Sequence, residues 1–182
     1  ASVRDARRNA FALLSELDLL EHPGAVGLLN SLDEQTRSIT ATMIERGINS
    51  PRTSSMGRLF DAAAAILGIC GQATYEGEPA IELEAAAWRA LDGKIARFPD
   101  DNVGYSTSGP SWLDGPDVLD QKALFEALLE GIEAGAPADR LALDFHVAVA
   151  RSSARTATEI CAREGIGTVA LSGGVFMNRL LL

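Results

Sequence analysis

Helical periodicity is the sequence feature that most constrains the fold of this chain. In residues 3–20, Phe11, Leu14 and Leu17 recur at a spacing of three, which places them on one face of a helix. Comparable patterns cover most of the sequence. Only residues 168–171 have the short apolar run that is typical of a buried strand. The sequence therefore predicts a predominantly α-helical chain with few strands.

Turn-forming residues give the expected limits of these helices. Gly47, Gly68 and Gly165 suit the left-handed backbone that often follows a helix. Pro79 and Pro137 suit the first turn of a helix, where a missing N–H costs nothing. The expected helices cover residues 3–20, 32–47, 56–67, 79–91, 119–132 and 137–164, and residues 98–116 form a long loop or a weak hairpin.

Composition excludes several classes of protein. The 182 residues are 47% apolar and 23% charged, as in an ordinary globular domain. No apolar run reaches the roughly 20 residues of a membrane span, and the N-terminus lacks the apolar region of a secretion signal. Cys70 and Cys161 lack metal-binding spacing and are expected to be buried free thiols. These features favour a cytoplasmic protein without a membrane partner.

The charge of the chain argues against nucleic acid as a direct partner. The formal net charge is −9 and the isoelectric point is near 4.7. Binding to a phosphate backbone requires clustered lysine and arginine residues, which release counterions from the nucleic acid. We therefore expect no direct contact with nucleic acid.

A glycine pair follows the predicted strand in residues 172–178. Gly173 and Gly174 allow positive φ angles and a close approach of the backbone, and a helix is expected to begin directly after them. Such a turn directs backbone N–H groups at an anion such as phosphate. The turn lacks the lysine of a P-loop and the third glycine of a dinucleotide fingerprint. From this turn alone, phosphate binding and a purely structural turn remain equally open.

Gly57 and Asp61 form a second candidate feature at the start of the helix expected over residues 56–67. Their spacing of four places them on one helical face. There the glycine leaves room for a ribose or a base, and the carboxylate can accept hydrogen bonds from two hydroxyl groups. The alternative is an exposed aspartate that simply complements the helix dipole.

Three motifs give the chain a resemblance to a known family. TSSMGRLFDAAAAILG, TYEGEPAIELEAAA and ALSGGVFMNRLLL follow one another in this order, and Phe145-His146 lies between the second and third. Together they resemble the C-terminal part of the HypF family of hydrogenase-maturation carbamoyltransferases. The resemblance implies that residues 1–182 are the C-terminal portion of a TsaD-like domain, truncated at both ends. Such a domain has the α/β actin/Hsp70-type ATPase superfold.

The resemblance also implies a reaction and a site. Family members hydrolyse carbamoyl phosphate to carbamate, activate it with ATP as carbamoyl-adenylate, and transfer the carbamoyl group to the C-terminal cysteine of HypE. The implied nucleotide-binding residues are Gly57, Asp61, Gly173, Gly174 and Asn178. The first two would contact the ribose, and the other three would contact the phosphates and the ribose or base. Catalytic residues cannot be assigned, and the missing N-terminal domains of the same enzyme are expected partners.

Metal ligands are not expected within this chain. The family's divalent metal is held by an HxxxH pair and an aspartate, which the resemblance places outside residues 1–182. The two histidines, His22 and His146, form no such pair, and His146 is expected to be a partly buried structural residue. Without the metal site, the isolated chain is expected to transfer no carbamoyl group and to bind ATP weakly or not at all.

Glu76 belongs to an acidic group with Glu78, Glu82 and Glu84 that could serve as general base or substrate contact. It lies in a motif that matches the family, so a contact with substrate is possible, yet glutamates at a helix start usually complement the helix dipole.

Two alternative functions also remain. One is an O-carbamoyltransferase of the same superfold that modifies a small-molecule hydroxyl, and the other is a catalytically silent interaction module. A tRNA-modifying relative fits the acidic charge less well.

Overall fold

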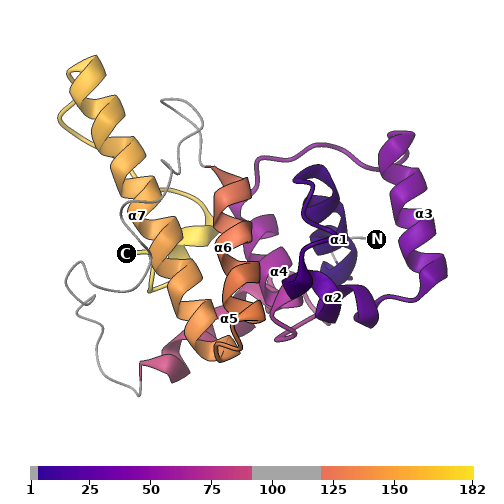
Figure 1. The fold of residues 1–182 in the computed structure, drawn as a ribbon. Helices are drawn as coiled ribbons and strands as arrows, with labels where there is room; N and C mark the ends of the chain where they lie inside the picture. The colour runs from indigo at the N-terminus through magenta and orange to yellow at the C-terminus, as the bar shows by residue number, and fades with distance from the viewer. Residues whose placement is uncertain (1–3, 92–119) are drawn as a thin grey trace.

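The computed structural model describes residues 4–91 and 120–182, which form a helical assembly (Figure 1). This part of the chain contains no strand, and its one β-type pairing is an isolated bridge between Asp5 and Gln72. The expected loop over residues 98–116 lies outside the described residues. The elements are α1 (Ala6–Glu16), the 3₁₀ helix η1 (Pro23–Ala25), α2 (Val26–Ser31), α3 (Glu34–Glu45), α4 (Met56–Ile66), α5 (Glu78–Ala90), α6 (Gln121–Glu133), α7 (Ala138–Glu164) and the 3₁₀ helix η2 (Gly174–Met177).

Local capping sets most helix ends, and the predicted helices are confirmed in these regions. Asp33 precedes α3, and its Oδ1 accepts a hydrogen bond of 2.7 Å from the backbone N–H of Thr36. Gly47, Gly68 and Gly165 follow α3, α4 and α7 with φ angles of 64°, 69° and 66°. These ends depend on neighbouring residues only, which is why the sequence predicted them closely.

The end of α1 differs from the prediction. The helix ends at Glu16 rather than at residue 20, because Asp18 adopts a left-handed φ of 57°. The backbone N–H of Leu19 then binds the carbonyl oxygen of Leu14 at 2.8 Å, and the Leu19 side chain is buried. Aspartate is one of the few residues besides glycine that adopt this conformation readily, so no glycine marks the end in the sequence.

The core is built around α4. Its residues Ala62, Ala63 and Ala64 have no exposed surface, and such small side chains allow neighbouring helices to approach closely. One side of α4 packs against α1 and another against α5, which in turn packs along α7. Phe60 of α4 meets Phe145 of α7 edge to face, with ring centroids 5.4 Å apart. These contacts join the N-terminal helices to the C-terminal half of the chain.

The C-terminal half of α7 lies apart from this core. Figure 1 shows α7 extending beyond the other helices, with the yellow C-terminal segment returning beside it. The buried residues of α7 lie between Leu141 and Ser152. Beyond Ser152, the helix is therefore covered incompletely by the described residues.

The prediction of a strand over residues 168–171 is wrong. The segment is not hydrogen-bonded to a neighbouring strand within residues 4–91 and 120–182, and Val169 and Leu171 are 52% and 57% exposed. A strand needs a partner for its backbone N–H and C=O groups, whatever its own sequence favours. The β-type pattern is present, but the described chain supplies no sheet for it.

The two cysteines are free, as expected, but their burial is incomplete. Cys70 and Cys161 are both half-buried, so the expectation of full burial is wrong. The pKa of the Cys70 thiol is raised, chiefly by partial burial and further by the nearby carboxylate of Glu78.

Within the described residues, no helix is long and apolar enough to cross a membrane.

Gly24 provides a test of this packing. A Cβ atom at Gly24 would lie 2.2 Å from the backbone carbonyl oxygen of Leu129 in α6, so Gly24→Ala must displace one of the two segments. We expect it to lower the free energy of unfolding by about 1–3 kcal/mol in urea denaturation. Gly27→Ala is the matched control, because Gly27 lies in the adjacent α2 with open space around its Cβ position. It should raise stability by up to about 1 kcal/mol, and equal effects of the two substitutions would contradict the close contact between η1 and α6.

Candidate functional site

The first part of the candidate site is the N-terminal half of α4. Gly57 lies in its first turn, and a Cβ atom there would meet only the Ser55 Oγ, at 3.6 Å, so the helix surface is open at this point. Asp61 lies one turn later and is only 3% exposed. The alternative interpretation of Asp61 as an exposed aspartate is therefore wrong.

Asp61 is a buried carboxylate with incomplete partners. Its Oδ2 lies 3.0 Å from the Arg58 Nη1, but this ion pair lacks hydrogen-bond geometry, and the Asp61 Oδ1 has no hydrogen-bond partner. Burial raises the pKa of Asp61, and the charge of Glu76 adds to the rise. Arg58 and the backbone N–H of Ala80 act in the opposite direction. Burial changes the pKa of Asp61 more than the ion pair with Arg58 does. The fold therefore disfavours the charged form of this side chain.

The second part is the glycine turn, residues 172–178. Gly173 has φ 100° and ψ 162°, which a residue with a side chain would adopt only with strain. Both Gly173 and Gly174 are exposed, and a Cβ atom at either would meet no atom within 4 Å. The expected helix after the turn is present as the single 3₁₀ turn of η2. The turn therefore presents exposed backbone.

Asn178 ends the glycine turn in a different environment. It is 9% exposed, and its Nδ2 lies 2.8 Å from the Nε2 of His146 in α7. Its Oδ1 accepts a hydrogen bond of 3.0 Å from the backbone N–H of Leu180. Both ends of the amide are thus used within the fold. A ligand could reach only the second N–H or the second lone pair of this side chain.

The two parts are connected through α4 and η2, which contact each other. Phe60, which precedes Asp61 in α4, packs edge to face on His146 with ring centroids 5.1 Å apart. His146 in turn contacts Asn178. Segments far apart in the sequence therefore meet at this point. We also expect the five candidate residues to converge on one cleft, because a single nucleotide would have to contact all of them.

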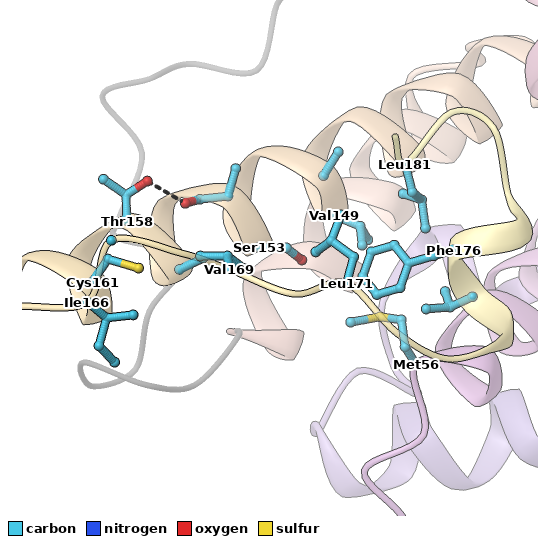
Figure 2. A pocket seen from close by; sticks show the side chains of 15 residues that line it. Met56, Val149, Ser153, Thr158, Cys161, Ile166, Val169, Leu171, Phe176 and Leu181 are labelled. Carbon is cyan, nitrogen blue, oxygen red and sulfur yellow. Dashed lines mark hydrogen bonds between the residues drawn. The ribbon is translucent and has the colours of Figure 1, made fainter. Parts of the chain in front are cut away.

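A cavity of about 630 Å³ lies beside this junction. Figure 2 shows it between the C-terminal half of α7 and the returning segment 166–171, with Leu171 and Phe176 directed into it. Met56, at the start of α4, also lines it. The lining is largely apolar, and none of the five candidate residues belongs to it.

The structure gives Glu76 and Glu78, two members of the acidic group, different environments. Glu78 accepts hydrogen bonds from the backbone N–H and the hydroxyl of Thr74, and the first of these lowers its pKa most. Glu78 therefore has a structural role. Glu76 is exposed and acts on Asp61 through its charge.

Both histidines have structural partners. The Nδ1 of His22 accepts a hydrogen bond of 3.1 Å from the backbone N–H of Gly24. His146 has no exposed surface and is thus more deeply buried than expected. In the described part of the chain, no group of three or more His, Cys, Asp or Glu residues is placed to hold a metal ion.

Sequence reasoning missed two residues that hold the glycine turn. One is His146, and the other is Glu84 of α5, whose Oε1 accepts a hydrogen bond of 2.9 Å from the backbone N–H of Arg179. The Phe145-His146 pair was a weak signal for the first. Glu84 is identifiable from the sequence only as a member of the acidic group, and nothing in the sequence predicted its bond to Arg179, because that bond depends on contact between α5 and a segment far away in the sequence.

Comparison with known proteins supports the resemblance in sequence. A family model described as "Carbamoyltransferase, Kae1-like Domain, second subdomain" matches residues 1–182. The chain is 39% identical over 170 residues to a carbamoyltransferase HypF homolog of Cupriavidus necator, covering 91% of this chain and 41% of that protein. It is 36% identical over 146 residues to carbamoyltransferase HypF of Rhodobacter capsulatus, covering 80% and 17%. The chain therefore spans less than half the length of these relatives.

Solved structures agree in fold. HypF of T. kodakarensis superimposes with a TM-score of 0.72 and 29% identity, covering 99% of this chain and 23% of that one. A full-length HypF in a phosphate- and nucleotide-bound form gives a TM-score of 0.76 at 24% identity, covering 99% and 26%. The helical arrangement is thus that of a HypF fragment, and the expected fold class is confirmed. The chain belongs to the HypF carbamoyltransferase family, in which it matches the second subdomain of the Kae1-like domain.

Proposed function

We propose that this chain supplies nucleotide contacts in a cytoplasmic carbamoyltransferase that uses ATP and carbamoyl phosphate. The relatives are named carbamoyltransferases, and one similar structure is described as nucleotide-bound. Water hydrolyses carbamoyl phosphate to carbamate and inorganic phosphate. A carbamate oxygen then attacks the α-phosphorus of ATP, the bond to pyrophosphate breaks, and carbamoyl-adenylate forms. The thiolate of an acceptor cysteine, which we propose to be the C-terminal cysteine of HypE, then takes the carbamoyl group and releases AMP.

The buried carboxylate of Asp61 is the observation that carries this proposal. Its Oδ1 has no hydrogen-bond partner although it is shielded from water, and burial disfavours its charge. An unsatisfied buried acceptor normally costs about 1–3 kcal/mol. A ribose hydroxyl would donate the missing hydrogen bond once the groups that cover Oδ1 move aside on binding, and the open surface at Gly57 would leave room for the sugar.

The phosphates would lie at Gly173 and Gly174. Both residues are exposed, and no side chain closes the space beside them. Backbone N–H groups of such a turn can bind phosphate without a lysine. Asn178 would contribute with the second N–H of its Nδ2 or the second lone pair of its Oδ1, since each of these atoms already makes one hydrogen bond. Glu76 is a weaker candidate for substrate contact.

A divalent metal belongs to this proposal only through residues outside the chain. The described residues include no suitable group of ligands, so we assign no step of the reaction to a metal held here. The remaining domains of the enzyme would complete the site, and the isolated chain is not proposed to act alone. The net charge of −9 supports the expectation that nucleic acid is not a partner.

Asp61→Ala in the complete enzyme tests the proposed site. Losing charge-assisted hydrogen bonds to the ribose, worth about 1.5–3 kcal/mol, should weaken ATP binding by roughly tenfold to a hundredfold. Calorimetric titration with ATP measures the affinity, and mass spectrometry of HypE measures carbamoyl transfer. Asp144→Ala is the matched control, because Asp144 is also a buried aspartate paired with an arginine of its own helix.

The stability of Asp61→Asn separates function from folding. Asp61→Asn leaves Arg58 without its counter-charge, but the side chain of Arg58 is 22% exposed and that of Asp61 only 4%, so the neutral asparagine should cost less stability than Arg58→Met. ATP binding should nevertheless weaken. Unchanged affinity and transfer in Asp61→Ala would remove Asp61 from the site, and undetectable ATP binding by the wild-type complete enzyme would support the silent interaction module instead.

A further inference from the structure

The chain leaves the glycine turn through residues 178–180, which we call the exit of the turn. The exit is held at two points, although the turn itself is open to solvent. Gly173 and Gly174 have no packing neighbours at their Cβ positions. After Asn178, in contrast, the chain binds α7 through His146 and α5 through Glu84, and Leu180 is 2% exposed. The position of the turn therefore depends strongly on the residues that hold its exit.

The hydrogen bonds around His146 have only one consistent direction. At one end, the carbonyl oxygen of Ala142, 2.7 Å from the His146 Nδ1, can only accept. At the other end, the backbone N–H of Leu180 can only donate to the Asn178 Oδ1. His146 must therefore donate from Nδ1 and accept at Nε2 from the Asn178 Nδ2. This arrangement fixes the orientation of the Asn178 amide.

Only the neutral imidazole fits this arrangement. A second proton on Nε2 would point at the N–H groups of Asn178, and turning the amide would break its bond to Leu180. Burial lowers the pKa of His146, against the effects of the Ala142 carbonyl and the charge of Glu84, and so favours the neutral form. Phe60 packs on the ring and limits its movement.

Glu84 holds the next residue of the exit. Its Oε1 accepts hydrogen bonds from the backbone N–H of Arg179 at 2.9 Å and from the Trp88 Nε1 at 3.3 Å. The second bond lies within α5 and is the longer of the two. Two adjacent residues, Asn178 and Arg179, are thus held by side chains of two different helices.

We propose that His146 and Glu84 are positioning residues for nucleotide binding. They hold Asn178 and Arg179, and thereby place the backbone of Gly173 and Gly174 for contact with phosphate. This inference rests on the proposed function of the glycine turn. Neither residue touches the nucleotide in this arrangement, so removing either should weaken binding without removing a ligand contact.

Substitutions at His146 in the complete enzyme test the proposal. His146→Phe keeps a ring against Phe60 but provides no acceptor for Asn178, and we expect the Kd for ATP to rise about tenfold. His146→Gln restores an acceptor and should stay within about threefold of wild type. Calorimetry measures Kd, and thermal unfolding measures stability on the same samples. If both variants lose stability equally and bind ATP as the wild type does, His146 is only structural and the proposal fails.

Glu84 gives an independent test if His146→Phe does not fold. Glu84→Ala should raise the Kd for ATP about threefold to tenfold, whereas Glu84→Gln retains an oxygen for the Arg179 N–H and should bind nearly as wild type. Trp88→Phe is the control, because it removes the other partner of Glu84 and leaves the bond to Arg179. An unchanged Kd in Glu84→Ala, or an equal loss in Trp88→Phe, would overturn the role of Glu84.

Asp61→Ala, measured in parallel, separates the two proposals. If Asp61→Ala weakens ATP binding and the His146 and Glu84 variants do not, the positioning role is wrong while the proposed site stands. If ATP binding is unchanged in all of these variants, the proposed function itself fails. Weaker binding in Asp61→Ala, His146→Phe and Glu84→Ala, with recovery in the two glutamine variants, would support both.

Discussion

Phe145→Ala is expected to lower the free energy of unfolding by about 3–5 kcal/mol. Phe145 is 1% exposed and contacts Phe60 of α4 and Phe125 of α6, with ring centroids 5.4 and 5.7 Å away. Removing the ring leaves a cavity where three helices meet, and helices fixed by their other contacts can collapse into it only partly. Urea denaturation of the 182-residue chain measures the effect.

Two further substitutions serve as controls, because both should have smaller effects on stability than Phe145→Ala. Phe145→Leu keeps most of the buried volume and should cost less than about 1.5 kcal/mol. Ile39→Ala removes an apolar side chain that is 48% exposed on α3, and should change stability by no more than about 0.5 kcal/mol. A loss below about 1 kcal/mol in Phe145→Ala would show that α4, α6 and α7 do not share one core.

Arg58→Met should destabilise the chain by about 3–5 kcal/mol at pH 7, because it leaves the carboxylate of Asp61 buried without its counter-charge. Arg155→Met is the matched control. Arg155 forms an ion pair with Glu159 on α7 in which both side chains are well exposed, so its loss should cost at most about 1 kcal/mol. Similar losses in both variants would contradict the burial of Asp61.

The destabilisation by Arg58→Met should depend on pH. Burial already raises the pKa of Asp61, and removing Arg58 raises it further. Between the unfolded pKa near 3.8 and the higher folded pKa, the folded state binds more protons than the unfolded state. The stability of the variant therefore falls as pH rises through this window. Urea denaturation should show a small difference from wild type near pH 4 and the full difference at pH 7, whereas a constant difference would contradict this account.

Local signals in the sequence were sufficient for most of the helices. Asp33, Gly47 and Gly165 act on the backbone groups of their immediate neighbours, so their effect can be predicted without knowing the fold. Asp18 shows where this approach fails. Its left-handed conformation ends α1 before residue 20, and the helical spacing of the apolar residues continues past it.

The surroundings of the candidate residues could be predicted from the sequence only in part. Gly57 and Gly173 were identified from their positions in motifs, and the structure shows open surface at both. The sequence could not show that Asp61 is buried, because its burial depends on packing around α4. It also could not show that Asn178 binds His146, since these residues come from segments that meet only in the folded chain.

Residues 168–171 show most directly what the sequence determined and what only the tertiary structure decided. Their pattern of β-branched and apolar residues favours a strand, and such a local preference belongs to the sequence alone. A strand forms, however, only when another strand pairs with its N–H and C=O groups, and the described residues provide none. The sequence by itself determined the family, the helices and the glycine turn, because these depend on local pattern. Tertiary packing decided the charge environment of Asp61 and the support of the turn by His146 and Glu84, because both arise from contacts between distant segments.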